Sequence, residues 1–214
     1  MKKKNMFSDK NLPEPLFINE IEKEISLSMI DENDHIFFDN QFTNEKRIRT
    51  YIYNMILNAQ KFLPDGYYFK IYEAYRPLQE QKKLWEEVKK EQKILHPDMD
   101  EDSEEFIGLC DTYCANPYRQ GSGHQTGAAI DVSLCDKDGN DYFMGSTVRA
   151  FSEKSDFNYF VSEEAQKNRS LLKEALEKAG FINYPSEWWH YSFGDRLWAK
   201  LTGSKIAIFG KIDV

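Results

Sequence analysis

The stretch of sequence that decides the fold runs from Ser122 to Leu134 and reads SGHQTGAAIDVSL. Residues 128–134 form an apolar, partly β-branched run that holds one carboxylate, Asp131, and such a run predicts a strand. The polar residues before it, which carry two glycines and His124, predict a loop. His124 is therefore expected to leave the loop, and Asp131 to project from the strand that follows.

The segments upstream of this strand alternate between helix and strand signals. Apolar residues recur at helical spacing over 43–63, with Thr43 as a possible N-cap and a Pro-Asp-Gly turn at 64–66. Residues 67–75 are aromatic and β-branched, which predicts a strand. Pro77 suits the first turn of a second helix through about residue 95, and the acidic segment 96–106 is expected to be a loop or a frayed helix.

The segments downstream complete the prediction. Residues 142–151 are expected to return as a hairpin partner, 163–179 as a helix stopped by Gly180, and 188–193 and 205–212 as strands. Helices and strands are mixed without a regular βαβ alternation. We therefore predict an α+β fold in which helices flank a central antiparallel sheet.

The length of the chain limits it to one substantial domain. It has 214 residues, of which 41% are hydrophobic and 30% charged, a balance that argues against overall disorder. The first residues are polar and carry Pro13 and Pro15, which predicts an extended arm. We expect an N-terminal arm over 1–17 and one domain over 18–214.

Charge and cysteine content narrow the function classes. The net charge of −8 disfavours a general binder of nucleic acid or anionic membranes, since both need a positive surface. The sequence contains no run of about 18 apolar residues, so we expect no membrane span. The first lysines are not followed by the apolar core of a signal peptide. Three cysteines are typical of a reducing compartment, so we expect a cytoplasmic protein. Cys110 and Cys114 have spacing that could hold a metal, but buried thiols are the more ordinary interpretation.

Four residues have the chemistry of a catalytic metal site. His124, Asp131 and His190 can occupy three corners of a zinc tetrahedron and leave the fourth for water. Glu187, three residues before His190, can then serve as a general base, provided that the chain turns near Trp188. For each of these residues taken alone a structural role is the preferred interpretation, such as a loop cap, a core histidine or an ordinary hydrogen bond.

Two motifs together identify a family resemblance. The pattern S-x-H-x-x-G-x-A-x-D over 122–131, followed by E-W-W-H at 187–190, resembles the zinc D-alanyl-D-alanine dipeptidases, within the wider group of zinc D,D-peptidases (peptidase family M15). Other segments are similar to that family as well: DNQFT at 39–43, IYEAYRP at 71–77, MGS at 144–146, GF at 180–181, YSFGD at 191–195 and AIFG at 207–210. The resemblance runs from about residue 18 to 212 and implies the hedgehog/D,D-peptidase-like fold.

The resemblance implies a complete catalytic set. A single zinc ion would be held by His124, Asp131 and His190, with Glu187 as the catalytic base. Arg76 would stabilise the oxyanion of the tetrahedral intermediate, a role that suits a permanently charged guanidinium. Without the resemblance, a structural ion pair between Arg76 and a carboxylate such as Glu73 would be the preferred interpretation.

The substrate side departs from the family pattern. Ser122 matches the serine that helps to hold the substrate carboxylate, although a loop serine can also simply cap a turn. Arg149 stands where the dipeptidases have an aspartate for the free amine of the dipeptide, and a cation there repels an ammonium group. From the family resemblance and its complete catalytic set we nevertheless expect a peptidase for D-Ala-D-Ala or a similar short peptide containing D-amino acids. A carboxypeptidase that trims peptidoglycan stem peptides remains the alternative, and a binding module with a structural zinc is a third possibility.

Overall fold

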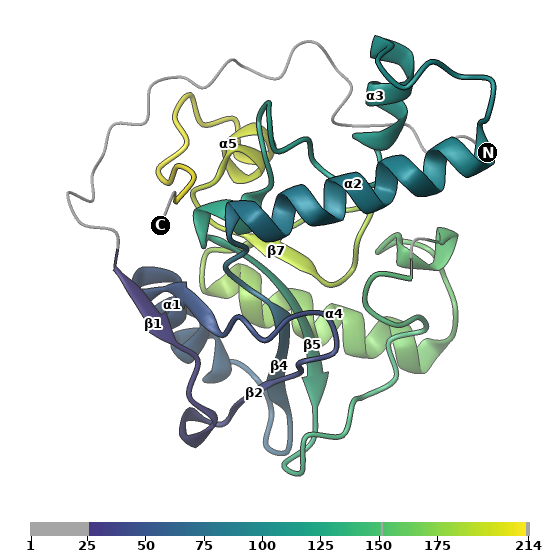
Figure 1. Cartoon of the computed structure of the whole chain (residues 1–214). Coiled ribbons are helices and arrows are strands. Elements are labelled where there is room, and N and C mark those ends of the chain that lie inside the picture. The colour runs from purple at the N-terminus through teal and green to yellow at the C-terminus, as the bar shows by residue number, and fades with distance from the viewer. Residues whose placement is uncertain (1–25, 151, 213–214) are drawn as a thin grey trace.

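The computed structural model describes residues 26–150 and 152–212 (Figure 1). Its centre is a five-stranded sheet in the order β2-β4-β5-β7-β6. The strands are β2 (Ile36–Phe38), β4 (Tyr68–Glu73), β5 (Ala129–Cys135), β6 (Ile182–Asn183) and β7 (His190–Ser192). The N-terminal arm predicted for 1–17 lies outside the described residues.

The pairing of the strands confirms the mixed fold and corrects one part of the prediction. The pairs β4–β5, β5–β7 and β6–β7 are antiparallel, whereas the edge strand β2 runs parallel to β4. Between β2 and β4 the chain passes through β3 (Arg47–Arg49) and α1 (Thr50–Gln60), and a crossover of this length allows a parallel pair. β3 pairs separately with β1 (Leu27–Met29) in a two-stranded sheet.

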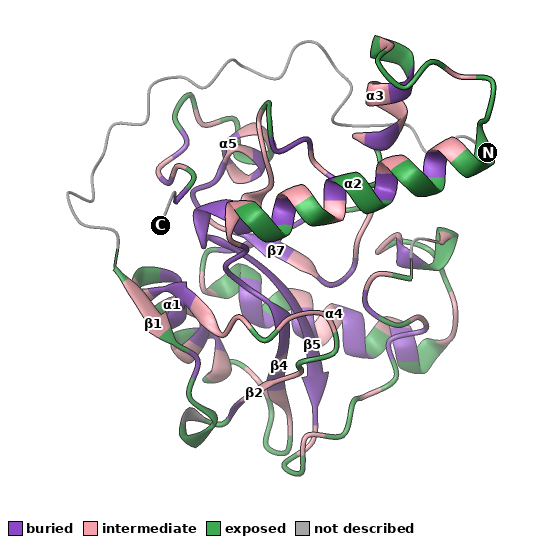
Figure 2. Ribbon diagram, in the orientation of Figure 1, coloured by how far each residue is buried: buried purple, intermediate pink, exposed green. Residues whose placement is uncertain are grey.

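Two helices pack with the sheet to form the main core. All seven residues of β5 are buried, which accounts for its uninterrupted apolar run (Figure 2). Helices α1 and α4 (Glu163–Lys178) contact each other and share one buried cluster with β4 and β5. Helix α4 begins at the N-cap Ser162 and ends before Gly180, whose positive φ of 103° suits a glycine stop.

A second, smaller core lies between α2 (Leu78–Leu95) and α3 (Glu104–Cys110). Helix α2 crosses the front of the view with one buried stripe (Figure 2). Its Trp85 and Val88 pack against Phe106, Cys110 and Cys114. Both cysteines are buried free thiols, as predicted.

Several predicted boundaries are wrong because short elements carry little periodic signal. Helix α1 begins at Thr50 rather than Thr43, since 47–49 belong to β3. Residues 205–212 form a loop, and the expected hairpin partner after β5 is reduced to a bridge between Cys135 and Asp141. Helix α5 (Arg196–Thr202), capped by Asp195, was not predicted. None of the helices in the described part of the chain is long and apolar enough to cross a membrane.

Candidate active site

A short capped turn places His124 just before β5. The 3-10 turn η2 (Gly123–Thr126) is preceded by Ser122, whose Oγ accepts from the His124 backbone N–H at 3.2 Å. Gln125 closes the capping box, because its Oε1 accepts from the Ser122 backbone N–H at 2.9 Å. Gly127 ends the turn in the left-handed region, with φ of 65°, which a glycine adopts without strain.

The three predicted metal ligands converge. Asp131 on β5 lies opposite His190 on β7 in the sheet register. Asp131 Oδ1 lies 3.3 Å from His124 Nε2 and 3.0 Å from His190 Nδ1, and one ligand atom from each residue lies within 4.8 Å of the others. His124 Nδ1 lies 2.9 Å from the carbonyl oxygen of Ala74, which directs Nε2 into the cluster. Two imidazole nitrogens and a carboxylate around one point fit a divalent ion such as zinc.

The charges of this cluster depend on one another. Burial by itself raises the pKa of Asp131, but interactions with His124 and His190 outweigh it and hold that pKa well below its ordinary value. Burial lowers the pKa of His190, yet the hydrogen bond to Asp131 raises it overall. Asp131 is therefore a carboxylate, the form in which it can ligate a metal.

A tight turn brings the Glu187 side chain next to this cluster, close to His190. The Glu187 backbone N–H donates to the Tyr184 carbonyl at 2.9 Å, and the His190 N–H donates to the Glu187 carbonyl at 3.1 Å. The turn near Trp188 that the sequence required is therefore present. Glu187 Oε2 lies 4.0 Å from His190 Nδ1, and the Glu187 side chain keeps 25% of its surface exposed. Trp188 and Trp189 are both buried beside it.

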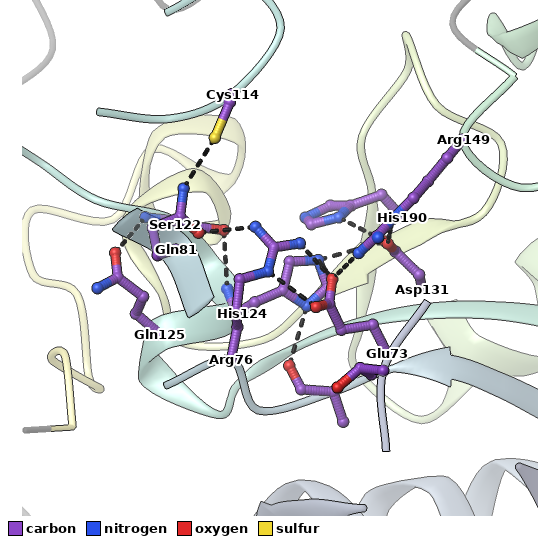
Figure 3. A network of polar contacts seen from close by, with 12 residues as sticks. Glu73, Arg76, Gln81, Cys114, Ser122, His124, Gln125, Asp131, Arg149 and His190 are labelled. Atoms are coloured by element: carbon purple, nitrogen blue, oxygen red, sulfur yellow. Dashed lines mark hydrogen bonds and ion pairs between the residues drawn. The ribbon is translucent and has the colours of Figure 1, made fainter. Parts of the chain in front are cut away.

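Arg76 is held by protein groups on two sides. Its Nε donates to Glu73 Oε1 at 2.8 Å, its Nη2 pairs with Glu73 Oε2, and its Nη1 donates to Gln81 Oε1 at 2.7 Å (Figure 3). Its backbone N–H donates to the His124 carbonyl at 3.0 Å, so Arg76 adjoins the metal cluster. The ion pair between Arg76 and Glu73, which is the structural alternative for Arg76, is therefore present, and it lies in the wall of the same site.

Glu73 belongs to this site as well, although the sequence predicts no role for it beyond an ion pair with Arg76. Arg149 also pairs with Glu73 Oε2, so a single carboxylate holds both arginines. Burial raises the pKa of Glu73, but Arg76, His124 and Arg149 lower it to about 2. The only signal in the sequence was an acidic residue three positions before Arg76, which is too common a pattern to identify a role.

Arg149 points into the centre of the site from the loop after β5 (Figure 3). Its Nε lies 3.6 Å from Asp131 Oδ2, and its guanidinium carbon lies 4.5 Å from the centroid of the Phe42 ring. Its φ of 60° is in the left-handed region, which a non-glycine residue seldom adopts. The loop therefore accepts an unfavourable backbone conformation at the residue that carries this cation into the site.

A cavity of about 600 Å³ opens over the cluster. All of the predicted site residues line it: Arg76, Ser122, His124, Asp131, Arg149, Glu187 and His190. Ser122 caps the turn at His124, as its structural interpretation required, and also faces this space. A cavity of this size accommodates a small peptide.

Comparisons with known proteins agree with this arrangement. Residues 48–206 match the family described as D-Ala-D-Ala dipeptidase, peptidase family M15. D-alanyl-D-alanine dipeptidases from Synechocystis and Escherichia coli are 36% identical over 42% of this chain and 32% identical over 59% of it. These matches cover 44% and 55% of the two relatives, so the chain spans about half the length of the curated relatives it matches.

Solved structures share the fold. VanYB in complex with D-alanine-D-alanine is 18% identical, with a TM-score of 0.52 and coverage of 92% of this chain and 93% of that one. A mutant of the vancomycin-resistance D,D-pentapeptidase VanY in complex with Zn(II) is also 18% identical, with a TM-score of 0.50 and coverage of 87% and 89%. Because the family match spans most of the chain and includes the whole candidate site, the chain belongs to the D-Ala-D-Ala dipeptidase family, peptidase family M15.

Proposed function

We propose that this protein is a zinc-dependent dipeptidase that hydrolyses D-alanyl-D-alanine or a similar short dipeptide containing D-amino acids. The observation that carries the proposal is the convergence of His124, Asp131 and His190 beside Glu187 and Arg76 in one cavity. A purely structural metal would need neither a partly exposed carboxylate nor a guanidinium beside it. That contrast disfavours a binding module without hydrolysis.

One zinc ion per chain would be held by the two histidines and Asp131. Zinc, when bound, makes water a stronger acid and polarises the carbonyl that is attacked. The donor set suits it, since imidazole and carboxylate are both common zinc ligands. The contact between His124 Nδ1 and the Ala74 carbonyl would keep Nε2 directed at the ion.

Glu187 and Arg76 would divide the work of peptide hydrolysis. Glu187 takes the proton from the attacking water on its carboxylate and later delivers it to the leaving amine. Arg76 donates hydrogen bonds to the oxygen of the scissile carbonyl as negative charge develops there. Ser122 and Arg149 would bind the substrate, with Ser122 close to the substrate carboxylate.

The position of Arg149 favours a second candidate function. Its guanidinium lies within the site, where it would repel the free ammonium group of a dipeptide. A D,D- or L,D-carboxypeptidase acts on a peptidoglycan stem peptide, and this substrate has no ammonium group next to the scissile bond. This alternative therefore deserves a direct comparison with the dipeptidase.

The test is alanine release by the zinc-loaded protein from D-Ala-D-Ala and, in parallel, from a stem pentapeptide that ends in the same pair. Hydrolysis of the dipeptide supports the dipeptidase, whereas hydrolysis of the pentapeptide alone supports the carboxypeptidase. Inactivity on both peptides with zinc bound would contradict the dipeptidase and the D,D-carboxypeptidase. Metal analysis of the same samples gives the number of zinc ions per chain.

The cellular setting is a further part of the proposal. We propose a cytoplasmic enzyme whose partner is a small peptide rather than nucleic acid or a membrane. The three cysteines are buried free thiols, which suits a reducing compartment, and the chain carries a net charge of −8. Fractionation of cells that express the protein would contradict this if the protein were found outside the cytosol.

A further inference from the structure

Gln81 connects Arg76 to the segment that follows α3. It lies in the first turns of α2 and is fully buried. Its Oε1 accepts from Arg76 Nη1 at 2.7 Å, and its Nε2 donates to the Ala115 carbonyl at 2.6 Å and to Cys114 Sγ at 3.1 Å (Figure 3). The oxygen and the nitrogen of the Gln81 amide are therefore both hydrogen-bonded, and this fixes Oε1 on the side of Arg76.

The hydrogen bonds of Arg76 leave little freedom for its guanidinium. A guanidinium has five N–H donors in a rigid plane. Glu73 takes two of them along one edge, and Gln81 takes one on Nη1. Among the described residues these are its side-chain hydrogen bonds, so two N–H groups remain for a ligand. Because Glu73 alone would still allow the plane to tilt about that edge, Gln81 determines where the remaining donors point.

The hydrogen bonds of Gln81 also reach from Arg76 to the segment that follows α3. Helices α2 and α3 pack around their own small cluster, which does not include residues of the main sheet. Cys114 and Ala115, which follow α3, line the cavity together with Arg76. The Gln81 amide therefore ties the arginine to this helical wall of the site.

We propose that Gln81 is a positioning residue that holds the Arg76 guanidinium in the orientation needed to stabilise the reacting carbonyl oxygen. The inference rests on the proposed peptidase function. Misplacement of a catalytic group by about 1 Å can cost roughly 100-fold in rate. Loss of the Gln81 acceptor is therefore expected to lower kcat by roughly 10- to 100-fold and to leave KM nearly unchanged, because Arg76 acts mainly on charge that develops during the reaction.

The experiment compares three variants of the zinc-loaded protein. Gln81→Met removes the amide at similar volume, whereas Gln81→Glu keeps an acceptor within reach of Arg76. Gln92→Met is the matched control, because Gln92 is also buried on α2 and lies well along the helix from the site. We expect kcat to fall most in Gln81→Met, to fall less in Gln81→Glu, and to stay at the wild-type value in Gln92→Met, with normal zinc content in all three. A phosphinate analogue of the dipeptide should lose affinity by the same factor as kcat/KM.

A second readout does not depend on turnover. NMR of the ¹⁵N-labelled protein measures how fast the Arg76 guanidinium protons exchange with water, and the Arg76→Lys variant assigns their signals. We expect this exchange to accelerate at least about tenfold in Gln81→Met but not in Gln92→Met. If both kcat and exchange in Gln81→Met match the wild type, the inference is wrong. An inactive wild-type protein would contradict the proposed function, and the exchange rates would then decide the role of Gln81 independently.

Discussion

Arg149 places its Nε 3.6 Å from Oδ2 of Asp131, so a cation adjoins one of the three proposed metal ligands. The same guanidinium pairs with Glu73, which also holds Arg76. Glu73 thus compensates two positive charges beside the metal site, that of buried Arg76 and that of partly buried Arg149, and without it each would carry a desolvation cost. This arrangement makes Arg149 part of the electrostatics of the site, in addition to the role against a free amine that we propose for it.

Replacement of Arg149 should change substrate preference. Arg149→Ala removes the cation that would repel the ammonium group of D-Ala-D-Ala, so we expect kcat/KM for this dipeptide to rise roughly tenfold relative to the stem pentapeptide. Arg149→Lys keeps the charge and serves as the control. An unchanged ratio of the two kcat/KM values in Arg149→Ala would rule out this role for Arg149.

Removal of a metal ligand should weaken zinc binding strongly. His124→Ala leaves two protein ligands, and we expect the zinc affinity to fall by at least about 100-fold. His96→Ala, at an exposed histidine beyond the end of α2, should bind zinc as the wild type does. The zinc content of the two variants is measured after dialysis against a weak chelator. Full retention of zinc by His124→Ala would disprove the assigned ligand set.

Removal of the proposed base should separate chemistry from metal binding. Glu187→Gln keeps the shape of the side chain but cannot accept a proton, so kcat should fall by roughly 10²- to 10⁴-fold while zinc content stays normal. Glu177→Gln changes an exposed carboxylate on α4 and should have no effect. Stopped-time assays of alanine release at saturating peptide provide the comparison, and near-normal turnover in Glu187→Gln would require a different base.

Glu73 should make the apo protein sensitive to acid. Its pKa is lowered to about 2 from an ordinary value of 4.5, so its charged form stabilises the folded state above about pH 4.5. That contribution, on the order of 3 kcal/mol, should be lost as the pH falls from 4.5 towards 2. Glu73→Gln should be less stable at neutral pH and show a shallower loss over this window. Urea unfolding at pH 6, 4 and 3 with chelator present measures the difference, and parallel pH curves for the two proteins would refute it.

The sequence by itself determined the elements that carry a strong local signal. Helices α2 and α4 and strands β4 and β5 were predicted because apolar spacing, turn residues and stops such as Gly180 act over a few neighbouring residues. The proposed ligand set could also be predicted, because His124, Asp131 and His190 belong to two distinctive motifs. Their convergence in the structure follows from the β5–β7 pairing.

Only the tertiary structure decided that a single carboxylate, on Glu73, holds both arginines of the site. Glu73 meets Asp131 through the antiparallel register of β4 and β5, and Arg149 reaches Glu73 from the loop after β5. The parallel pairing of β2 was equally invisible, since a three-residue strand has no periodicity of its own and its partner is chosen by long-range packing. Such contacts depend on the position of the backbone in space, which no local pattern of residues encodes.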